Sequence, residues 1–212
     1  MGTTSSFKVE IKQSLNGLMV LLGFFLMGTS LTFSQTTIWS ENFNSYSNGT
    51  ENGTASGPSA SSWTTTLTGD VWVQGNRIEA NNLGTEGVWQ TNAINIYGYT
   101  SVRFSLDVAT MSNTSQFEQG QDYLIGEYRI DGAGPWTEFE NASGDSSPSD
   151  PLDPSSTVNL PSAGSTLEIR IRFYNTAGNE YYYIDNILVE GTLPFCSGEV
   201  DFEFYDSVPG GN

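Results

Sequence analysis

Apolar and polar residues alternate over short segments of this chain, and clusters of Gly, Asn and Ser separate these segments. The alternation is clearest in SVRFSLDVA (101–109) and in TLEIRIRFY (166–174). Because successive side chains of a strand point to opposite faces, each segment predicts a strand with one buried face. The predicted inward residues are Val102, Phe104, Leu106 and Val108 in the first strand, and Leu167, Ile169, Ile171 and Phe173 in the second.

A third segment, DYLIGEYRI (122–130), follows the pattern less cleanly, with Leu124, Tyr128 and Ile130 inward. The DGAGPW that follows it is typical of a hairpin turn. Beyond the N-terminal region no segment has a helical period. The chain is therefore predicted to be all-β, an antiparallel β-sandwich or jelly roll.

The segment YYYIDNILVEG (181–191) is apolar on both parities, so we expect a strand that is covered on both faces. Asp185 interrupts the row formed by Tyr183 and Ile187. A buried carboxylate must be satisfied, because burying it without partners is costly. Two alternatives follow for Asp185: a metal ligand, or an acceptor of backbone N–H groups at a bulge.

The N-terminal region has the layout of a secretory signal peptide: Lys8 and Lys12, an apolar run over 18–27, then small and polar residues. We predict a signal peptide over 1–34, a sandwich module over 36–191 and a linker over 192–198. The apolar run is short for a membrane span, so no membrane insertion is expected. The protein is predicted to be secreted or on the cell surface.

Charge narrows the possible partners. Of 7 basic and 24 acidic residues, two lysines and one glutamate leave with the signal, so 5 arginines remain against 23 acidic residues. This surface repels nucleic acids and anionic membranes and favours divalent cations, calcium in particular. The absence of histidine excludes a histidine-based triad or zinc site, and Cys196 is the single cysteine.

Several segments together resemble a β-sandwich module of secreted bacterial proteins, of the carbohydrate-binding-module and MAM type, many of which leave the cell by the type IX route. They are WSENFNSYSNGT, GVWQTNAINIYGYTSVRFSLDV, EQGQDYLIGEYRIDGAGPW and LEIRIRFYNTAGNEYYYIDNILVEG. The resemblance implies a non-catalytic module for glycan binding or adhesion. Its partners would be a polysaccharide or cell-surface glycan and neighbouring domains of the same polypeptide.

The same resemblance implies a structural calcium (Ca2+) between the first and last strands, held by Glu41 or Asn44 together with Asp185. A second pair, Glu118 and Asp122 in EQGQDY, could also coordinate a cation. A solvated pair of surface acids is the alternative that we favour for those two residues.

Arginines and carboxylates alternate on the polar faces of the predicted strands. Arg103, Arg129, Arg170 and Arg172 could form a cross-strand ladder with Asp107, Glu127 and Glu168. Alternatively this face is a binding groove, and its ligand residues would be Trp136, Arg170, Arg172 and Tyr174. We assign Trp72 and Trp89 to packing and Trp136, directly after the predicted turn, to the surface.

The C-terminal GEVDFEFYDSVPGGN places Glu199, Asp201 and Glu203 on one face of a predicted strand. It resembles the active-site strand of laminarinase- and lichenase-type glycosidases. A retaining glycosidase needs two carboxyl groups roughly 5 Å apart, closer than residues four apart on one strand. Residues 199–212 better resemble the first strand of a lectin-like domain of the protective-antigen type. We therefore expect a binding module, with a structural spacer and a glycosidase as the alternatives.

Overall fold

The computed structural model describes residues 34–110, 118, 121–143, 156–161 and 164–193. The predicted signal peptide, apart from Ser34, lies outside these residues. So do residues 194–198 of the predicted linker and the whole C-terminal acidic segment with Glu199, Asp201 and Glu203. Within the described residues, no helix is long and apolar enough to cross a membrane.

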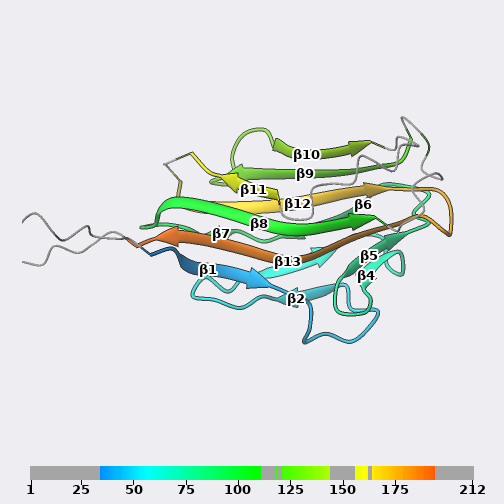
Figure 1. Cartoon of the computed structure of the whole chain (residues 1–212), viewed down its shortest axis with the longest axis horizontal. Coiled ribbons are helices and arrows are strands. Elements are labelled where there is room, and N and C mark those ends of the chain that lie inside the picture. The colour runs from blue at the N-terminus through cyan, green and yellow to red at the C-terminus, as the bar shows by residue number, and fades with distance from the viewer. Residues whose placement is uncertain (1–33, 111–117, 119–120, 144–155, 162–163, 194–212) are drawn as a thin grey trace, which may run out of the picture. The chain divides into compact units, whose positions relative to one another are not determined.

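Thirteen strands form in the described residues (Figure 1). They are β1 (Thr36–Glu41), β2 (Asn52–Thr54), β3 (Ser62–Thr65), β4 (Val71–Val73), β5 (Ile78–Asn81), β6 (Gly87–Thr91), β7 (Ile94–Asn95), β8 (Thr100–Thr110), β9 (Tyr123–Ile130), β10 (Thr137–Ser143), β11 (Ser156–Asn159), β12 (Thr166–Tyr174) and β13 (Tyr181–Thr192).

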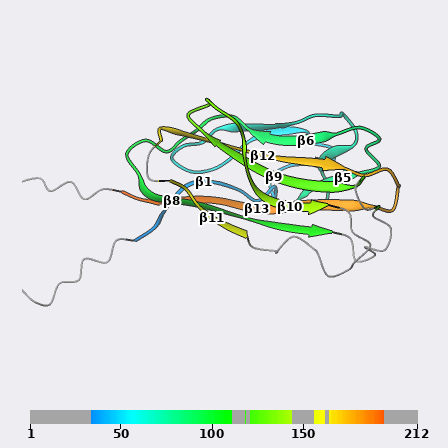
Figure 2. The ribbon, with the colours of Figure 1, turned by 90° about the horizontal axis from the view of Figure 1, so that it is seen from above.

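The strands form two antiparallel sheets. Sheet A has the order β11-β8-β13-β5-β4, with β1 also paired to β13. Sheet B has the order β10-β9-β12-β6-β3-β2, with β7 also paired to β12. Figure 2 shows the two layers, β6 and β12 in one and β8 and β13 in the other. The predicted all-β, jelly-roll β-sandwich is confirmed.

The core lies between the sheets and follows the alternation in the sequence. All eight inward residues predicted on β8 and β12 are buried, as is Leu124 of β9. Tyr128 and Ile130 are half-buried and pack against this core.

The aromatic part of the core contains two tryptophans. Trp63 and Trp89 pack with Phe43, with ring centroids 5.4 and 6.2 Å from the phenyl ring. The assignment of Trp89 to packing is thus confirmed. Trp72 differs: Val71 and Val73 take the inward positions of β4, which leaves Trp72 half-buried on the outside.

Strand β13 differs from the prediction that residues 181–191 form a strand covered on both faces. A bulge shifts its register against β8 between Asp185 and Leu188, and Asn186 has a φ of +49°. The extra residue changes the parity, so Tyr182 and Ile184 before the bulge face the same core as Ile187 and Val189 after it. The strand is fully buried on one face, and its other face, with Tyr183 and Leu188, is half-buried. The buried residues have even numbers before the bulge and odd numbers after it, so the sequence shows apolar residues at both alternating sets of positions.

Candidate functional site

The outer face of sheet B carries a row of charged and aromatic side chains on its central strand. On β12, the residues between the buried positions are Glu168, Arg170, Arg172 and Tyr174. The antiparallel register places Arg129 opposite Glu168, Glu127 opposite Arg170, and Tyr123 opposite Tyr174. We call this surface the charged aromatic face and define it by Glu86, Tyr123, Glu127, Arg129, Trp136, Glu168, Arg170, Arg172 and Tyr174.

Ion pairs connect the strands across this face. Arg129 binds Glu168 through two hydrogen bonds, Nε to Oε2 at 2.5 Å and Nη2 to Oε1 at 2.9 Å. Arg170 donates its Nε–H to Glu127 Oε2 at 2.6 Å. Both carboxylates belong to residues only 8% exposed, so the arginines compensate charges that water barely reaches. The predicted cross-strand ladder is present on this sheet.

Two residues of that predicted ladder lie elsewhere. Arg103 of β8 pairs with Glu190 of β13, at 2.9 Å, in sheet A. Asp107 of β8 lies opposite Asp185 of β13, and its Oδ2 accepts a hydrogen bond from the Asn186 side chain. The four arginines are thus divided between the two sheets, because β8 and β12 belong to different layers of the sandwich.

Trp136 lies over two arginines of the charged aromatic face. The guanidinium carbons of Arg129 and Arg170 are 4.6 and 4.1 Å from its ring centroid. The turn before it is anchored by Asp131, whose Oδ1 accepts the backbone N–H groups of Ser165 and Thr166 at the start of β12. Trp136 is half-buried, so part of the indole still faces solvent. Cation–π contacts of this kind fix the ring in place.

A pair of stacked aromatic rings lies at the other end of β12. Tyr123 stacks on Tyr174, with the ring centroids 5.7 Å apart and an angle of 21° between the planes. The Tyr123 hydroxyl donates to Glu86 Oε2 at 2.6 Å, and Arg172 binds the same carboxylate oxygen. Burial, with a further contribution from Glu86, raises the pKa of Tyr123 to about 12. Burial alone would raise the pKa of Glu86, but hydrogen bonds from Arg172 and Tyr123 outweigh it and lower that pKa.

The structure therefore gathers all four predicted ligand residues, Trp136, Arg170, Arg172 and Tyr174, on one face. Sequence reasoning missed Tyr123 and Glu86. Tyr123 has the outward parity of Glu127 and Arg129, a signal that could have been used. Glu86 lies in a loop before β6 and has no such signal.

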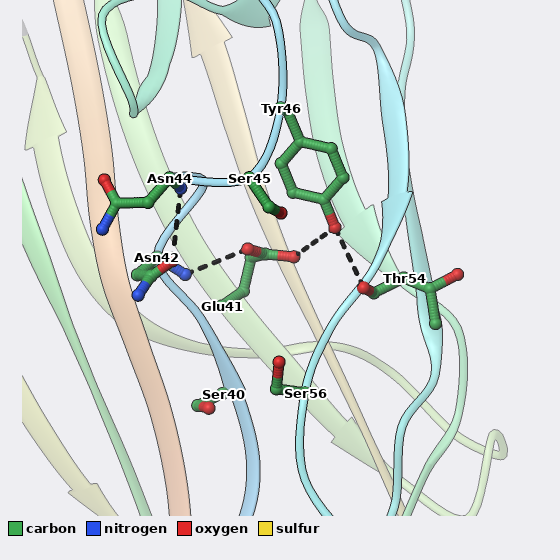
Figure 3. Close-up of a pocket in the computed structure, with 8 residues that line it drawn as sticks. All are labelled: Ser40, Glu41, Asn42, Asn44, Ser45, Tyr46, Thr54 and Ser56. Atoms are coloured by element: carbon green, nitrogen blue, oxygen red, sulfur yellow. Dashed lines mark hydrogen bonds between the residues drawn. The ribbon is translucent and has the colours of Figure 1, made fainter.

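A polar pocket of about 270 Å³ lies beside the end of β1 (Figure 3). Its lining residues are Ser40, Glu41, Asn42, Asn44, Ser45, Tyr46, Thr54 and Ser56. Glu41 is 5% exposed, and four donors surround its carboxylate. Oε1 accepts the N–H groups of Asn42 and Phe43, at 3.0 and 2.9 Å. Oε2 accepts from the Tyr46 hydroxyl at 2.9 Å and from Trp63 Nε1 at 2.7 Å.

These contacts bear on the calcium expected between the first and last strands. A carboxylate offers about four lone-pair sites, and donors occupy all four on Glu41. Asn44 lines the same pocket, but Asp185 is not one of the lining residues. Instead, Asp185 Oδ1 accepts the backbone N–H of Asn186 at 2.7 Å within the β13 bulge. Burial raises the pKa of Asp185; that hydrogen bond opposes the shift and the neighbouring Asp107 adds to it. Protein donors therefore occupy the Glu41 carboxylate, and the geometry of Asp185 matches the bulge alternative. A calcium ion between the first and last strands stays a prediction.

The other predicted cation pair is brought together with a third acid. Glu118 and Asp122 lie beside Glu180, which precedes β13, and ligand oxygens of the three side chains are all within 4.8 Å of one another. Asp122 and Glu180 are 0% and 1% exposed, whereas Glu118 is exposed. The solvated pair that the sequence favoured is therefore wrong for Asp122, while Glu118 does face solvent.

Comparisons with known proteins give structural similarity at low identity. No protein-family model and no curated protein sequence matches the chain. A cleaved adhesin domain of Lys-gingipain aligns at 19% identity, over 74% of this chain and 99% of that one, with a TM-score of 0.40. Another cleaved adhesin domain of Lys-gingipain, from Porphyromonas gingivalis, aligns at 7% identity over the same shares, with a TM-score of 0.44.

A family 29 carbohydrate-binding module complexed with cellulohexaose is similar at 15% identity. The alignment covers 76% of this chain and 93% of the module, with a TM-score of 0.40. At these TM-scores and identities, the similar structures assign neither a ligand nor an activity to this chain.

Proposed function

We propose that this chain is a non-catalytic extracellular module that binds a polysaccharide or cell-surface glycan through the charged aromatic face of sheet B. The observation that carries the proposal is Trp136, half-buried and held over Arg129 and Arg170. The predicted signal peptide supports a secreted or surface location, and the acidic composition argues against nucleic acid as the ligand.

The chemistry of this face suits a sugar. A pyranose ring has flat C–H faces that stack on aromatic rings, and its hydroxyl groups need donors and acceptors around them. Trp136 and the Tyr123–Tyr174 pair supply rings at two places along β12. Arg170 gives its Nε–H to Glu127, and a guanidinium has five N–H donors, so further donors remain for a ligand.

Ion pairing also makes this face ordered before a ligand arrives. Glu127 and Glu168 hold the arginines in fixed orientations, so fewer side-chain rotamers need to be frozen on binding. The same pairing favours the second candidate, a structural spacer domain without a ligand. A spacer needs the ion pairs, but it does not need the exposed part of Trp136.

Substitution of Trp136 separates these two functions. The full chain is run by affinity electrophoresis through gels that contain laminarin, xylan, galactan or soluble cellulose derivatives. We expect retardation by at least one polysaccharide, and a loss of at least tenfold in affinity for Trp136→Ala, since stacking on a tryptophan ring is removed. Tyr97→Ala is the control, because Tyr97 is an aromatic residue that is 74% exposed outside the charged aromatic face.

If Trp136→Ala and Tyr97→Ala are retarded equally, the charged aromatic face is not the binding site. If no glycan in a broad array binds the wild type, the spacer function replaces the proposal. The glycosidase alternative is checked on the same chain: hydrolysis of a β-glucan that is lost in both Glu199→Gln and Glu203→Gln would establish catalysis and overturn the non-catalytic assignment.

A further inference from the structure

Three acidic side chains from segments far apart in sequence meet at one end of the sandwich. We call Glu118, Asp122 and Glu180 the carboxylate cluster. Glu118 and Asp122 lie between β8 and β9, and Glu180 lies in the turn between β12 and β13. Their ligand oxygens lie within 4.8 Å of one another.

Two of these carboxylates, those of Asp122 and Glu180, are buried, and each has one oxygen without a hydrogen-bond partner in the part of the chain that the structure describes. Asp122 Oδ2 accepts the backbone N–H of Glu118, and Glu180 Oε2 accepts those of Thr176 and Ala177. Within the described residues, Asp122 Oδ1 and Glu180 Oε1 are buried and accept no hydrogen bond. Unpartnered carboxylate oxygens inside a protein are costly, and charges of the same sign beside them add to that cost.

From this geometry we propose that the carboxylate cluster binds a calcium ion. Calcium takes six to eight oxygen ligands at about 2.3–2.6 Å. Two ligands of one ion can then lie up to about 5 Å apart, so oxygens within 4.8 Å of one another can share one ion. Carbonyl groups or water would complete the shell. Backbone N–H groups hold the Asp122 and Glu180 carboxylates in place, and one ligand oxygen of each lies within 4.8 Å of the other.

A cation here would join two connections of the sandwich. It would hold the segment before β9 against the β12–β13 turn, which Asn175 already ties to Leu83 and Ala80. Asp122 directly precedes Tyr123, so the ion would also fix one end of the charged aromatic face. The site itself does not depend on glycan binding, and each can fail without the other.

Calcium titration of the full chain tests this site. Thermal unfolding is followed in EGTA and in calcium, and Tb³⁺ luminescence excited through tyrosine serves as a second probe. Tyr182 is a suitable sensitiser because Asp122 and Glu180 lie close enough to act on its hydroxyl. We expect calcium to raise Tm by about 5 °C or more at a hundredfold excess over Kd, and magnesium to do much less.

Variants distinguish a metal site from a merely structural cluster. Glu180→Gln and Asp122→Asn should lose the calcium shift, yet unfold in EGTA at the wild-type Tm or above, because repulsion between carboxylates is relieved. Glu118 is the exposed residue of the carboxylate cluster, so the Glu118→Gln variant should fold normally. This substitution should weaken calcium affinity at least about tenfold. Asp185→Asn is the matched control and should keep the full response.

The proposal is overturned if the wild type shows neither a calcium shift nor Tb³⁺ luminescence. It is also overturned if Glu118→Gln retains the wild-type affinity, or if Asp185→Asn abolishes the response. In that last case the cation would lie between the first and last strands instead.

Discussion

The guanidinium of Arg170 lies 4.1 Å from the ring centroid of Trp136, and this contact joins the β9–β10 turn to the centre of sheet B. Arg170 is also paired with Glu127 on β9, so one side chain holds both the ring and the neighbouring strand. The face that we propose for glycan binding is thus built from the same ion pairs that hold sheet B together. Stability and binding can be separated only by choosing substitutions that act on one of them.

The bidentate pair of Arg129 and Glu168 should contribute to stability mainly by preventing an unpaired buried charge. We expect Arg129→Leu to lower the free energy of unfolding by about 1–3 kcal/mol, because Glu168 keeps its charge without a partner. The double variant Arg129→Leu/Glu168→Leu should recover most of that loss. Urea unfolding of the four proteins gives the coupling energy; strictly additive effects would show that the pair contributes nothing.

Substitution of Glu41 should lower the free energy of unfolding far more than substitution of Glu51. Gln at this position keeps one acceptor oxygen, but its NH2 group then faces two of the four donors around it. We expect Glu41→Gln to destabilise the fold by about 2–4 kcal/mol in urea unfolding.

The matched control for Glu41 is Glu51→Gln. The Glu51 carboxylate accepts the N–H of Gly69 at an exposed position, and a change within about 0.5 kcal/mol is expected. Equal effects of the two substitutions would mean that the donors around Glu41 do not matter.

Gly126 on β9 provides space for the Phe139 ring. A Cβ at Gly126 would lie 2.5 Å from Phe139 Cζ, and Phe139 itself packs edge-to-face on Phe104 at 5.0 Å. Gly126→Ala should therefore cost about 1–3 kcal/mol through overpacking, and Phe139→Leu should relieve part of that cost. Gly178→Ala is the control, since no atom lies within 4 Å of a Cβ there. Similar chemical-denaturation midpoints for the two alanine variants would contradict this packing.

The ionised Glu86 carboxylate should make the free energy of unfolding fall at acid pH. Its pKa is lowered in the fold despite burial, because Arg172 and Tyr123 hydrogen-bond to the charged form. The unfolded chain therefore binds the proton more readily, and the stabilisation is present above the unfolded pKa and lost as pH falls through the folded one. Glu86→Gln should cost at most ~1 kcal/mol at pH 7, since both partners are partly exposed, and close to nothing at pH 3. A difference from wild type that persists at pH 3 would show another cause.

The sequence by itself determined the fold class and the direction of most side chains on β8, β9 and β12. A period of two is a local property, so alternation placed Phe104 and Ile171 in the core and Arg170, Arg172 and Tyr174 on one outer face. The hairpin turn placed Trp136 beside that face, because a turn of this length returns the chain next to the strand it leaves.

Only the tertiary structure decided which acids meet. Glu180 joins Glu118 and Asp122 because the β12–β13 turn lies beside the start of β9, a relationship between strands that no local pattern contains. The bulge at Asn186 reverses parity within β13, and the donors around Glu41 come from both neighbouring and distant residues, Tyr46 and Trp63. Local periodicity fixes which way a side chain points; its partners depend on how the strands are ordered in the two sheets.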